Sequence, residues 1–206
     1  MPGLRQPSRR ALLAIRAGVF VLCLFPVLYL AWGAWRDALG ANPIEAITHA
    51  TGEWTLRFLL LGLAVTPLRR LTGLDWLMRL RRMLGLYAFF YACLHLMTYL
   101  WLDQFFDWGG IVHDIGKRPF ITVGFLAVVL LAPLAATSFN AAMRLLGGRR
   151  WQALHRLVYV IAVCGVLHYW WLVKRDVTWP AFYAVVLAVL LWLRVQRWWF
   201  GTERRR

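Results

Sequence analysis

The sequence lacks the signatures of a soluble enzyme. It contains no G-x-G-x-x-G after a strand and no G-x-x-x-x-G-K-[ST], so no recognised motif binds a nicotinamide cofactor or a nucleoside triphosphate. Charged residues make up only 16% of the chain, and the 3 cysteines fall inside apolar segments, where they form no disulfide framework. Short loops leave no room for a soluble catalytic domain.

Apolar and aromatic residues dominate instead. The chain is 61% hydrophobic with 13 Trp, which exceeds what one soluble core of this size needs. A helix of about 20 residues spans a bilayer core, and we expect six such spans in a single transmembrane domain covering residues 1–206. They are predicted at 14–35, 54–71, 83–102, 119–139, 152–173 and 177–199. The predicted fold class is all-α, an integral membrane bundle of six transmembrane helices.

Two of the six segments depart from the simplest pattern. The segment 14–35 has no small-residue cleavage site of the A-x-A type and is long for a signal-peptide core, so we expect a retained helix. The segment 54–71 is weaker because Arg57 interrupts it. We expect the Arg57 side chain to snorkel to a nearby headgroup, since it lies near the end of its segment.

Basic residues are distributed unevenly between the two sides of the predicted bundle. With six spans both termini share one side, and that side receives 18 of the 24 Lys and Arg residues. Because Lys and Arg in short loops are retained in the cytoplasm, both termini are predicted to be cytoplasmic. The cytoplasmic set is Arg5, Arg9, Arg10, Arg16, Arg69, Arg70, Arg79, Arg81, Arg82, Arg144, Arg149, Arg150, Arg156, Arg194, Arg197 and Arg204 to Arg206. The outer set is Arg36, Arg57, Lys117, Arg118, Lys174 and Arg175.

This asymmetry accounts for most of the formal charge of +15 and suits contact with anionic lipid headgroups. With six hydrophobic spans, nucleic-acid binding is a poor explanation of the charge. On the outer side, Asn42, Pro43 and Glu45 have the order of a capped helix start, which predicts a short interfacial helix ending near Ala50. The outer loop 103–118 mixes aromatic residues with acids, as expected of a segment at headgroup level and of a docking surface.

His95 and His168 lie inside the third and fifth predicted spans, which run in the same direction. At about 1.5 Å per residue, they sit about 4 Å and about 9 Å beyond the midpoints of their helices, both in the outer half of the bilayer. Ionisable side chains at such depth indicate function, and two imidazoles at one level can bracket a haem iron. Gly165, Ala88 and Ala92 are small enough for a flat macrocycle to approach.

Other interpretations of the histidines remain open. Each could hydrogen-bond a neighbouring helix and simply hold helices together, whereas zinc is disfavoured because no carboxylate lies at that depth. His155 lies 13 residues before His168, about 20 Å lower along the helix and on another face. A second haem there would find only Met83 and Arg82 near it on the third span. His49 and His113 lie in outer segments and are expected to be solvated.

Four arginines are predicted to cluster at the level of His155, where they could grip propionates or a flavin phosphate by charge-assisted hydrogen bonds. They are Arg81, Arg82, Arg149 and Arg150. The alternative for these residues is topology and lipid contact alone.

The segments 41–73, 81–103, 117–138 and 149–171 together resemble the MsrQ family, also called YedZ, of haem-binding membrane subunits of bacterial methionine sulfoxide reductase systems. The spacing of the three membrane histidines also fits. This family is similar to the ferric-reductase-like transmembrane domain of NADPH oxidases, with six helices and b-type haem. The resemblance implies haem iron ligation by His95, His155 and His168, with His95 and His168 as the pair across one iron. The resemblance implies one haem b and leaves a second haem open, and FMN has been associated with the family.

The resemblance further implies a multi-pass protein of the bacterial inner membrane that serves as an electron-transfer subunit rather than the catalytic one. Electrons would arrive from the quinone pool or a cytoplasmic flavin reductase. They would leave to a periplasmic molybdopterin subunit that reduces methionine sulfoxide in oxidised proteins. The rival interpretation is a proton-coupled transporter that uses the same histidines as a relay, although no pair of broken helices in corresponding halves supports it.

Overall fold

A computed structural model describes residues 7–173 and 175–203, and Arg5, Lys174 and Arg204 to Arg206 lie outside this described part. Within it the chain is helical and contains no strand, which confirms the all-α prediction. The long helices are α1 (Arg9–Trp35), α2 (Pro43–Thr72), α3 (Arg81–Met97), α5 (Pro119–Ala136), α8 (Leu157–Leu172) and α9 (Thr178–Glu203). The short elements are η1 (Asp75–Arg79), the π-helical turn η2 (Thr98–Asp103), α4 (Trp108–Lys117), α6 (Asn140–Leu146) and α7 (Gly148–His155).

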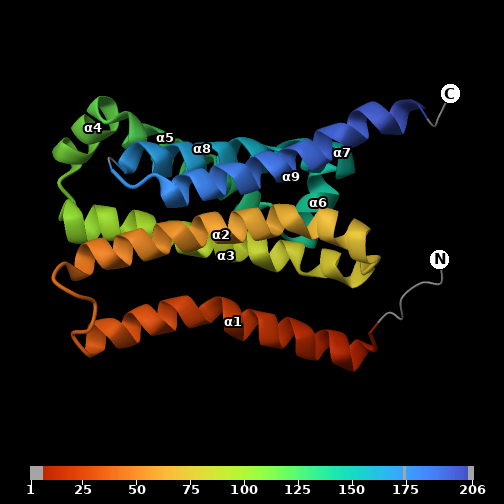
Figure 1. The fold of residues 1–206 in the computed structure, drawn as a ribbon, viewed down its shortest axis with the longest axis horizontal. Coiled ribbons are helices and arrows are strands. Elements are labelled where there is room, and N and C mark those ends of the chain that lie inside the picture. The colour runs from red at the N-terminus through yellow and green to blue at the C-terminus, as the bar shows by residue number, and fades with distance from the viewer. Residues whose placement is uncertain (1–6, 174, 204–206) are drawn as a thin grey trace.

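The long helices lie side by side in alternating directions (Figure 1). One end of the bundle carries α4 and the turns that precede α2 and α9, and we call it the α4 end. The opposite end carries η1, α6 and α7, together with the start of α1 and the last turns of α9 (Figure 1); we call it the α6 end. Helices α3 and α8 both run toward the α4 end, as expected for the third and fifth spans.

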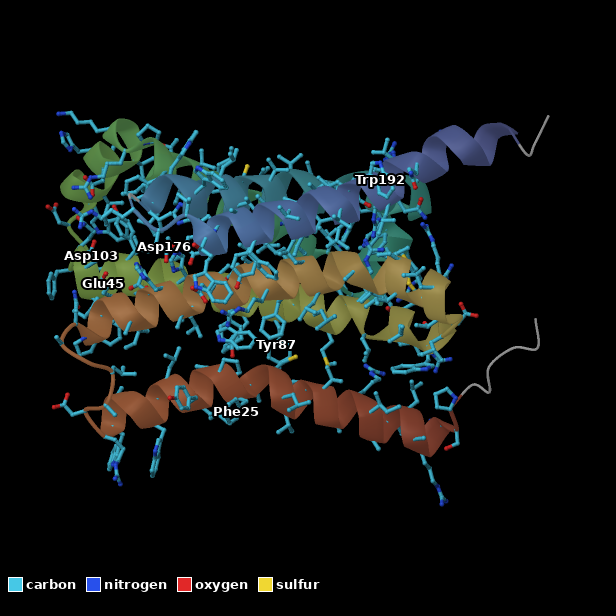
Figure 2. The ribbon with its side chains drawn as sticks, in the orientation of Figure 1. Phe25, Glu45, Tyr87, Asp103, Asp176 and Trp192 are labelled. Carbon is cyan, nitrogen blue, oxygen red and sulfur yellow. The ribbon has the colours of Figure 1, made fainter. Side chains whose placement is uncertain are left out.

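Five helical segments among the described residues are long and apolar enough to cross a membrane. They are Arg9–Trp35, Asp75–Asp103, Pro119–Ala136, Gly148–Leu172 and Thr178–Gln196. Helix α2 is not among them, although its 30 residues lie along α3 over most of the bundle (Figure 1). Large apolar side chains face outward on the outermost helices, including Phe25 on α1 and Trp192 on α9 (Figure 2), as lipid contact requires.

Helix α2 begins where the sequence predicts but extends further. The side chain of Asn42 accepts a hydrogen bond from the backbone N–H of Glu45 at 3.2 Å, with Pro43 in the first turn. The helix then continues without interruption to Thr72 and ends at Gly73, whose φ of 71° is left-handed. The prediction of a separate interfacial helix ending near Ala50 is therefore wrong, because nothing between Ala50 and Trp54 breaks the backbone hydrogen bonds.

The outer segment 103–118 is also more ordered than the sequence suggests, because it contains α4. Asp107 caps this helix, since its side chain accepts hydrogen bonds from the N–H groups of Gly109 and Gly110, each at 3.1 Å. The two glycines lower the helix propensity of the first turn, which hides the helix from a reading by propensity. Ile111 is buried and Val112 is exposed, so one face of α4 packs against the bundle and the other is left open.

Helix α1 is attached to the bundle through tyrosines of α3. The hydroxyl of Tyr91 donates to the carbonyl of Cys23 at 2.9 Å and accepts from the N–H of Val27 at 3.1 Å. These two backbone groups flank Pro26, so the hydroxyl occupies the position of one intrahelical hydrogen bond of α1. Tyr87, which points toward α1 (Figure 2), donates to the carbonyl of Phe20 at 2.9 Å.

Replacing Tyr91 with phenylalanine should loosen α1 from the bundle. The change leaves a buried carbonyl and a part-buried N–H without their shared partner, at a cost of about 2 kcal/mol, so we expect Tm to fall by about 4–8 °C. Thermal unfolding of the purified protein in detergent measures this effect. Tyr29→Phe on the outward face of α1 is the control, and equal Tm values for the two variants would contradict the bridging role.

Candidate functional site

A cavity of about 530 Å³ lies between α2, α3, α5 and α8 toward the α4 end, and we call it the histidine-pair cavity. His95 from α3 and His168 from α8 both line it, together with mostly apolar side chains such as Leu56, Leu131 and Ile161. The depth match inferred from the sequence therefore corresponds to one shared space. An apolar cavity with a few converging polar groups is the usual form of a cofactor site.

The two imidazoles face each other at a distance that suits one metal centre. Their ring centroids are 6.0 Å apart, and the ring planes are inclined by 79°. A metal–imidazole bond is about 2 Å long and each ring adds about 1 Å, so two imidazoles on one metal have centroids about 6 Å apart. The observed separation is therefore that of two imidazoles sharing one metal ion.

Backbone contacts orient both rings in the same way. Nδ1 of His95 lies 2.9 Å from the carbonyl oxygen of Thr48, and Nδ1 of His168 lies 2.6 Å from that of Phe120. A carbonyl oxygen only accepts, so each Nδ1 must carry the proton and donate it. Each Nε2 then keeps its lone pair, which is the tautomer that binds a metal.

Among the described residues that line the cavity, His95 and His168 are the histidines whose rings lie against each other. Within the described part of the chain, no group of three or more His, Cys, Asp or Glu side chains could hold an ion. Two imidazoles leave most coordination positions of a metal vacant, so the arrangement fits a metal that brings its own planar ligand, as haem does.

The small residues predicted beside this site divide into two groups. Ala92 and Gly165 line the cavity, as expected. Ala88 instead is fully buried in the apolar core with Phe58 and Tyr87. Ala88 lies four residues before Ala92, which places it about 40° further around the helix and one turn further from the α4 end, where it packs in the core rather than against the site.

A polar network that was not predicted from the sequence adjoins the histidine-pair cavity. Arg57 donates to Glu53 at 2.5 Å and to the hydroxyl of Tyr183 at 2.9 Å. The hydroxyl of Tyr169, next to His168, donates to the other oxygen of Glu53 at 3.0 Å. This network joins α2 to α8 and α9. The prediction that Arg57 snorkels to a headgroup is therefore wrong, because a carboxylate one turn earlier satisfies it, and the i,i+4 spacing was the available signal.

His155 lines a second cavity of about 550 Å³ toward the α6 end, and we call it the His155 cavity. Its Nδ1 lies 3.1 Å from the carbonyl oxygen of Trp151, on whose ring it stacks with centroids 3.9 Å apart. Its Nε2 is buried and has no hydrogen-bond partner within the described part of the chain. Like the other two, His155 thus lines a cavity and holds its Nδ1 against a backbone carbonyl oxygen.

The arginines around His155 differ from the predicted set. Four line the His155 cavity: Arg81, Arg82, Arg156 and Arg194. Arg149 and Arg150 are exposed on α7, and in the described structure they line neither cavity, because the turn at Gly147 directs the first turn of α7 outward. The sequence predicts Met83 near the depth of His155. The methionines that line the cavity are instead Met78 and Met143.

The two outer histidines lie where the sequence predicts. His113 is exposed on α4, and His49 is an exposed residue at the rim of the histidine-pair cavity. Neither donates a ring nitrogen toward the His95 and His168 pair in the hydrogen bonds of the described residues.

Comparison with known proteins finds one matching family model and several relatives that share the same name. A protein-family model described as "Ferric reductase like transmembrane component" matches residues 50–166. A protein of Azospira oryzae is 61% identical over 191 residues, covering 92% of this chain and 82% of its own length. One of Herminiimonas arsenicoxydans is 57% identical over 92% of this chain and 88% of its own length. One of Ralstonia nicotianae is 56% identical over 100% of this chain and 94% of its own. All three are named "Protein-methionine-sulfoxide reductase heme-binding subunit MsrQ".

Proposed function

Because this chain belongs to the MsrQ family of haem-binding subunits of protein-methionine-sulfoxide reductase, with a ferric-reductase-like transmembrane component, we propose that it carries electrons across the membrane for that reduction. The catalytic reduction of methionine sulfoxide then takes place in a separate subunit. Nothing in the described helices supplies a catalytic domain of its own.

The observation that carries the proposal is the orientation of His95 and His168. Each Nδ1 lies against a backbone carbonyl, both rings line one largely apolar cavity, and their centroids are 6.0 Å apart. This arrangement fits a single haem b with one imidazole on each side. Bound haem supplies one-electron oxidation and reduction. The apolar lining excludes water, and Arg118, which lines the cavity and pairs with Asp114 at 3.3 Å, is the cation there that would bind a propionate.

The His155 cavity is proposed to take a second anionic cofactor. His155 offers one unpaired Nε2, and the four surrounding arginines favour propionate or phosphate groups. Among the described residues, no second histidine lines this cavity, so a second haem there would lack a bis-imidazole pair. FMN is the other candidate. Measuring the number of haem and flavin groups per polypeptide distinguishes a second haem from FMN in this cavity.

We propose that α2 is the sixth span and that both termini are cytoplasmic in the bacterial inner membrane. The network of Glu53 and Arg57 with two tyrosines satisfies the charges of α2 inside the bundle, which lowers the cost of placing them at membrane depth. Most described arginines lie at the α6 end, which is the cytoplasmic side by the distribution of basic residues.

With this orientation the partners are assigned to opposite ends. The donor, a quinone or a cytoplasmic flavin reductase, is proposed to act near the His155 cavity at the α6 end. The acceptor, a periplasmic molybdopterin subunit, is proposed to dock at the α4 end. Exposed aromatic residues there, including Phe105 and Trp108, suit either a headgroup layer or a partner.

The absorption spectrum of the purified protein tests the proposal. After reduction with dithionite we expect the sharp α and β bands of low-spin haem, because two imidazoles give a strong ligand field. Replacing His49 or His113 should leave those bands unchanged, because in the described structure the hydrogen bonds of His95 and His168 go to Thr48 and Phe120 and to neither of these residues. A colourless protein that shows substrate-dependent proton flux would instead support the transporter.

A further inference from the structure

Each ring of the histidine pair rests against a glycine of the neighbouring helix. A Cβ atom added to Gly52 of α2 would lie 3.0 Å from Cε1 and 3.1 Å from Nδ1 of His95. One added to Gly124 of α5 would lie 2.6 Å from Nδ1 and 2.8 Å from Cε1 of His168. Contacts under 3.0 Å do not occur for real Cβ atoms, so any larger residue at Gly124 must displace the imidazole.

The two glycines also occupy the same place relative to the hydrogen bonds of the rings. Gly52 follows Thr48 by four residues, and Gly124 follows Phe120 by four residues, and these are the two carbonyls that accept from the histidines. A helical side chain points toward the N-terminus and lies over the preceding turn. A side chain at the fourth residue therefore covers the carbonyl, whereas a glycine leaves its second lone pair open to an outside donor.

We propose that Gly52 and Gly124 are positioning residues that seat His95 and His168, an inference that rests on the proposed function for its consequence but not for its geometry. Each glycine does two things at once. It makes room for the imidazole ring, and it exposes the carbonyl that holds the Nδ1 proton. Together these contacts fix the ring plane and direct Nε2 into the histidine-pair cavity.

The same device occurs twice in the fold. Helix α2 supplies the carbonyl and the glycine for His95 on α3, and α5 supplies them for His168 on α8. The donor and acceptor residues are 47 positions apart in the first case and 48 in the second. In each case the chain runs from the α4 end to the α6 end and returns (Figure 1). The equal depth of the two histidines follows from this repeated register.

A double-mutant experiment tests the positioning role of Gly124 without depending on haem. In a His95→Ala background the pair is broken, so no cofactor is held between the two rings. There, Gly124→Ala should lower Tm by roughly 5 °C, because the methyl group collides with the His168 ring. Adding His168→Ala removes the collision, and Gly124→Ala should then leave Tm unchanged or raise it, since alanine favours a helix.

Gly165→Ala in the same background is the matched control. It lies on α8, and its added Cβ would meet Leu56 at an ordinary 3.5 Å, so no fall in Tm is expected. A fall caused by Gly124→Ala that is equal with and without the His168 ring would overturn the proposal, whether or not the wild-type protein binds haem.

A second measurement uses the otherwise unchanged protein. Gly124→Ala should weaken haem retention about 10-fold, as loss of a ligand-orienting contact does, and Gly52→Ala should do so to a smaller extent, because its closest approach is 3.0 Å rather than 2.6 Å. Gly18→Ala, where an added Cβ meets nothing within 4 Å, should retain full haem. Unchanged haem content and unchanged low-spin bands in both Gly124→Ala and Gly52→Ala would overturn the inference. If the wild type itself lacks haem, the proposed function fails. The Tm difference between the variants with and without the His168 ring still tests whether Gly124 makes room for that ring.

Discussion

Replacing His168 with alanine should remove the low-spin haem spectrum of the histidine-pair cavity and lower haem affinity there at least about 10-fold. The reason is geometric. Of the pair only His95 then remains, and the described residues contain no group of three or more His, Cys, Asp or Glu side chains that could hold the ion instead. His95→Ala should have the same effect, because the centroids of the two rings lie 6.0 Å apart, the separation expected of two imidazoles that share one metal ion. Pyridine haemochrome assay and the reduced absorption spectrum of each purified variant measure the result.

His113→Ala is the control for the histidine variants. His113 is exposed on α4, so its removal changes the number of histidines without touching either cavity. His155→Ala separates the two cavities, because it should spare the bands that depend on His95 and His168. Full haem content in both His95→Ala and His168→Ala would rule out the pairing of these two residues.

The second large effect is expected from Arg57→Leu. This change leaves Glu53 charged, with the Tyr169 hydroxyl as its remaining donor among the contacts of the described residues. The side chains of Arg57 and Glu53 are only 33% and 27% exposed, and removal of one member of a largely buried pair costs about 3 kcal/mol. We expect Tm to fall by about 6–12 °C, as measured by thermal unfolding in detergent.

The compensating variant identifies the cause. Adding Glu53→Gln to Arg57→Leu removes the unpaired charge and keeps an acceptor for Tyr169, so most of the lost Tm should return. Arg69→Leu on the same helix breaks an exposed pair with Asp75 at 3.7 Å, which is worth less than about 1 kcal/mol. If Arg69→Leu and Arg57→Leu lower Tm equally, the pair of Arg57 with Glu53 stabilises the bundle no more than an exposed ion pair does, and the prediction is wrong.

The histidine pair is the part of the site that sequence reasoning located well. Depth follows from counting residues along an apolar segment, because a helix rises by a constant amount per residue. Rotation about the helix axis is less certain, since it depends on helix tilt and on the partners of each face. Ala88 illustrates this: its spacing suggested a wall of the site, and it lies in the core with Tyr87.

The arginines show a similar division. Arg81 and Arg82 lie beside His155 as predicted from their level in the membrane, whereas Arg149 and Arg150 are exposed on α7 and Arg194 joins from α9. Charge and level are properties of the sequence. The side of a helix that an arginine occupies depends on turns such as the one at Gly147, with φ of 74°, and these are hard to infer from composition.

By itself, the sequence determined that this protein is an all-helical membrane bundle with two imidazoles at one depth, because hydrophobic length and helical rise are local quantities. Only the tertiary structure decided that Thr48 and Phe120 hold those imidazoles, that Gly52 and Gly124 admit them, and that Arg57 pairs inside the bundle. These features depend on contacts between helices far apart in the chain, and no local pattern of residues encodes which faces will meet.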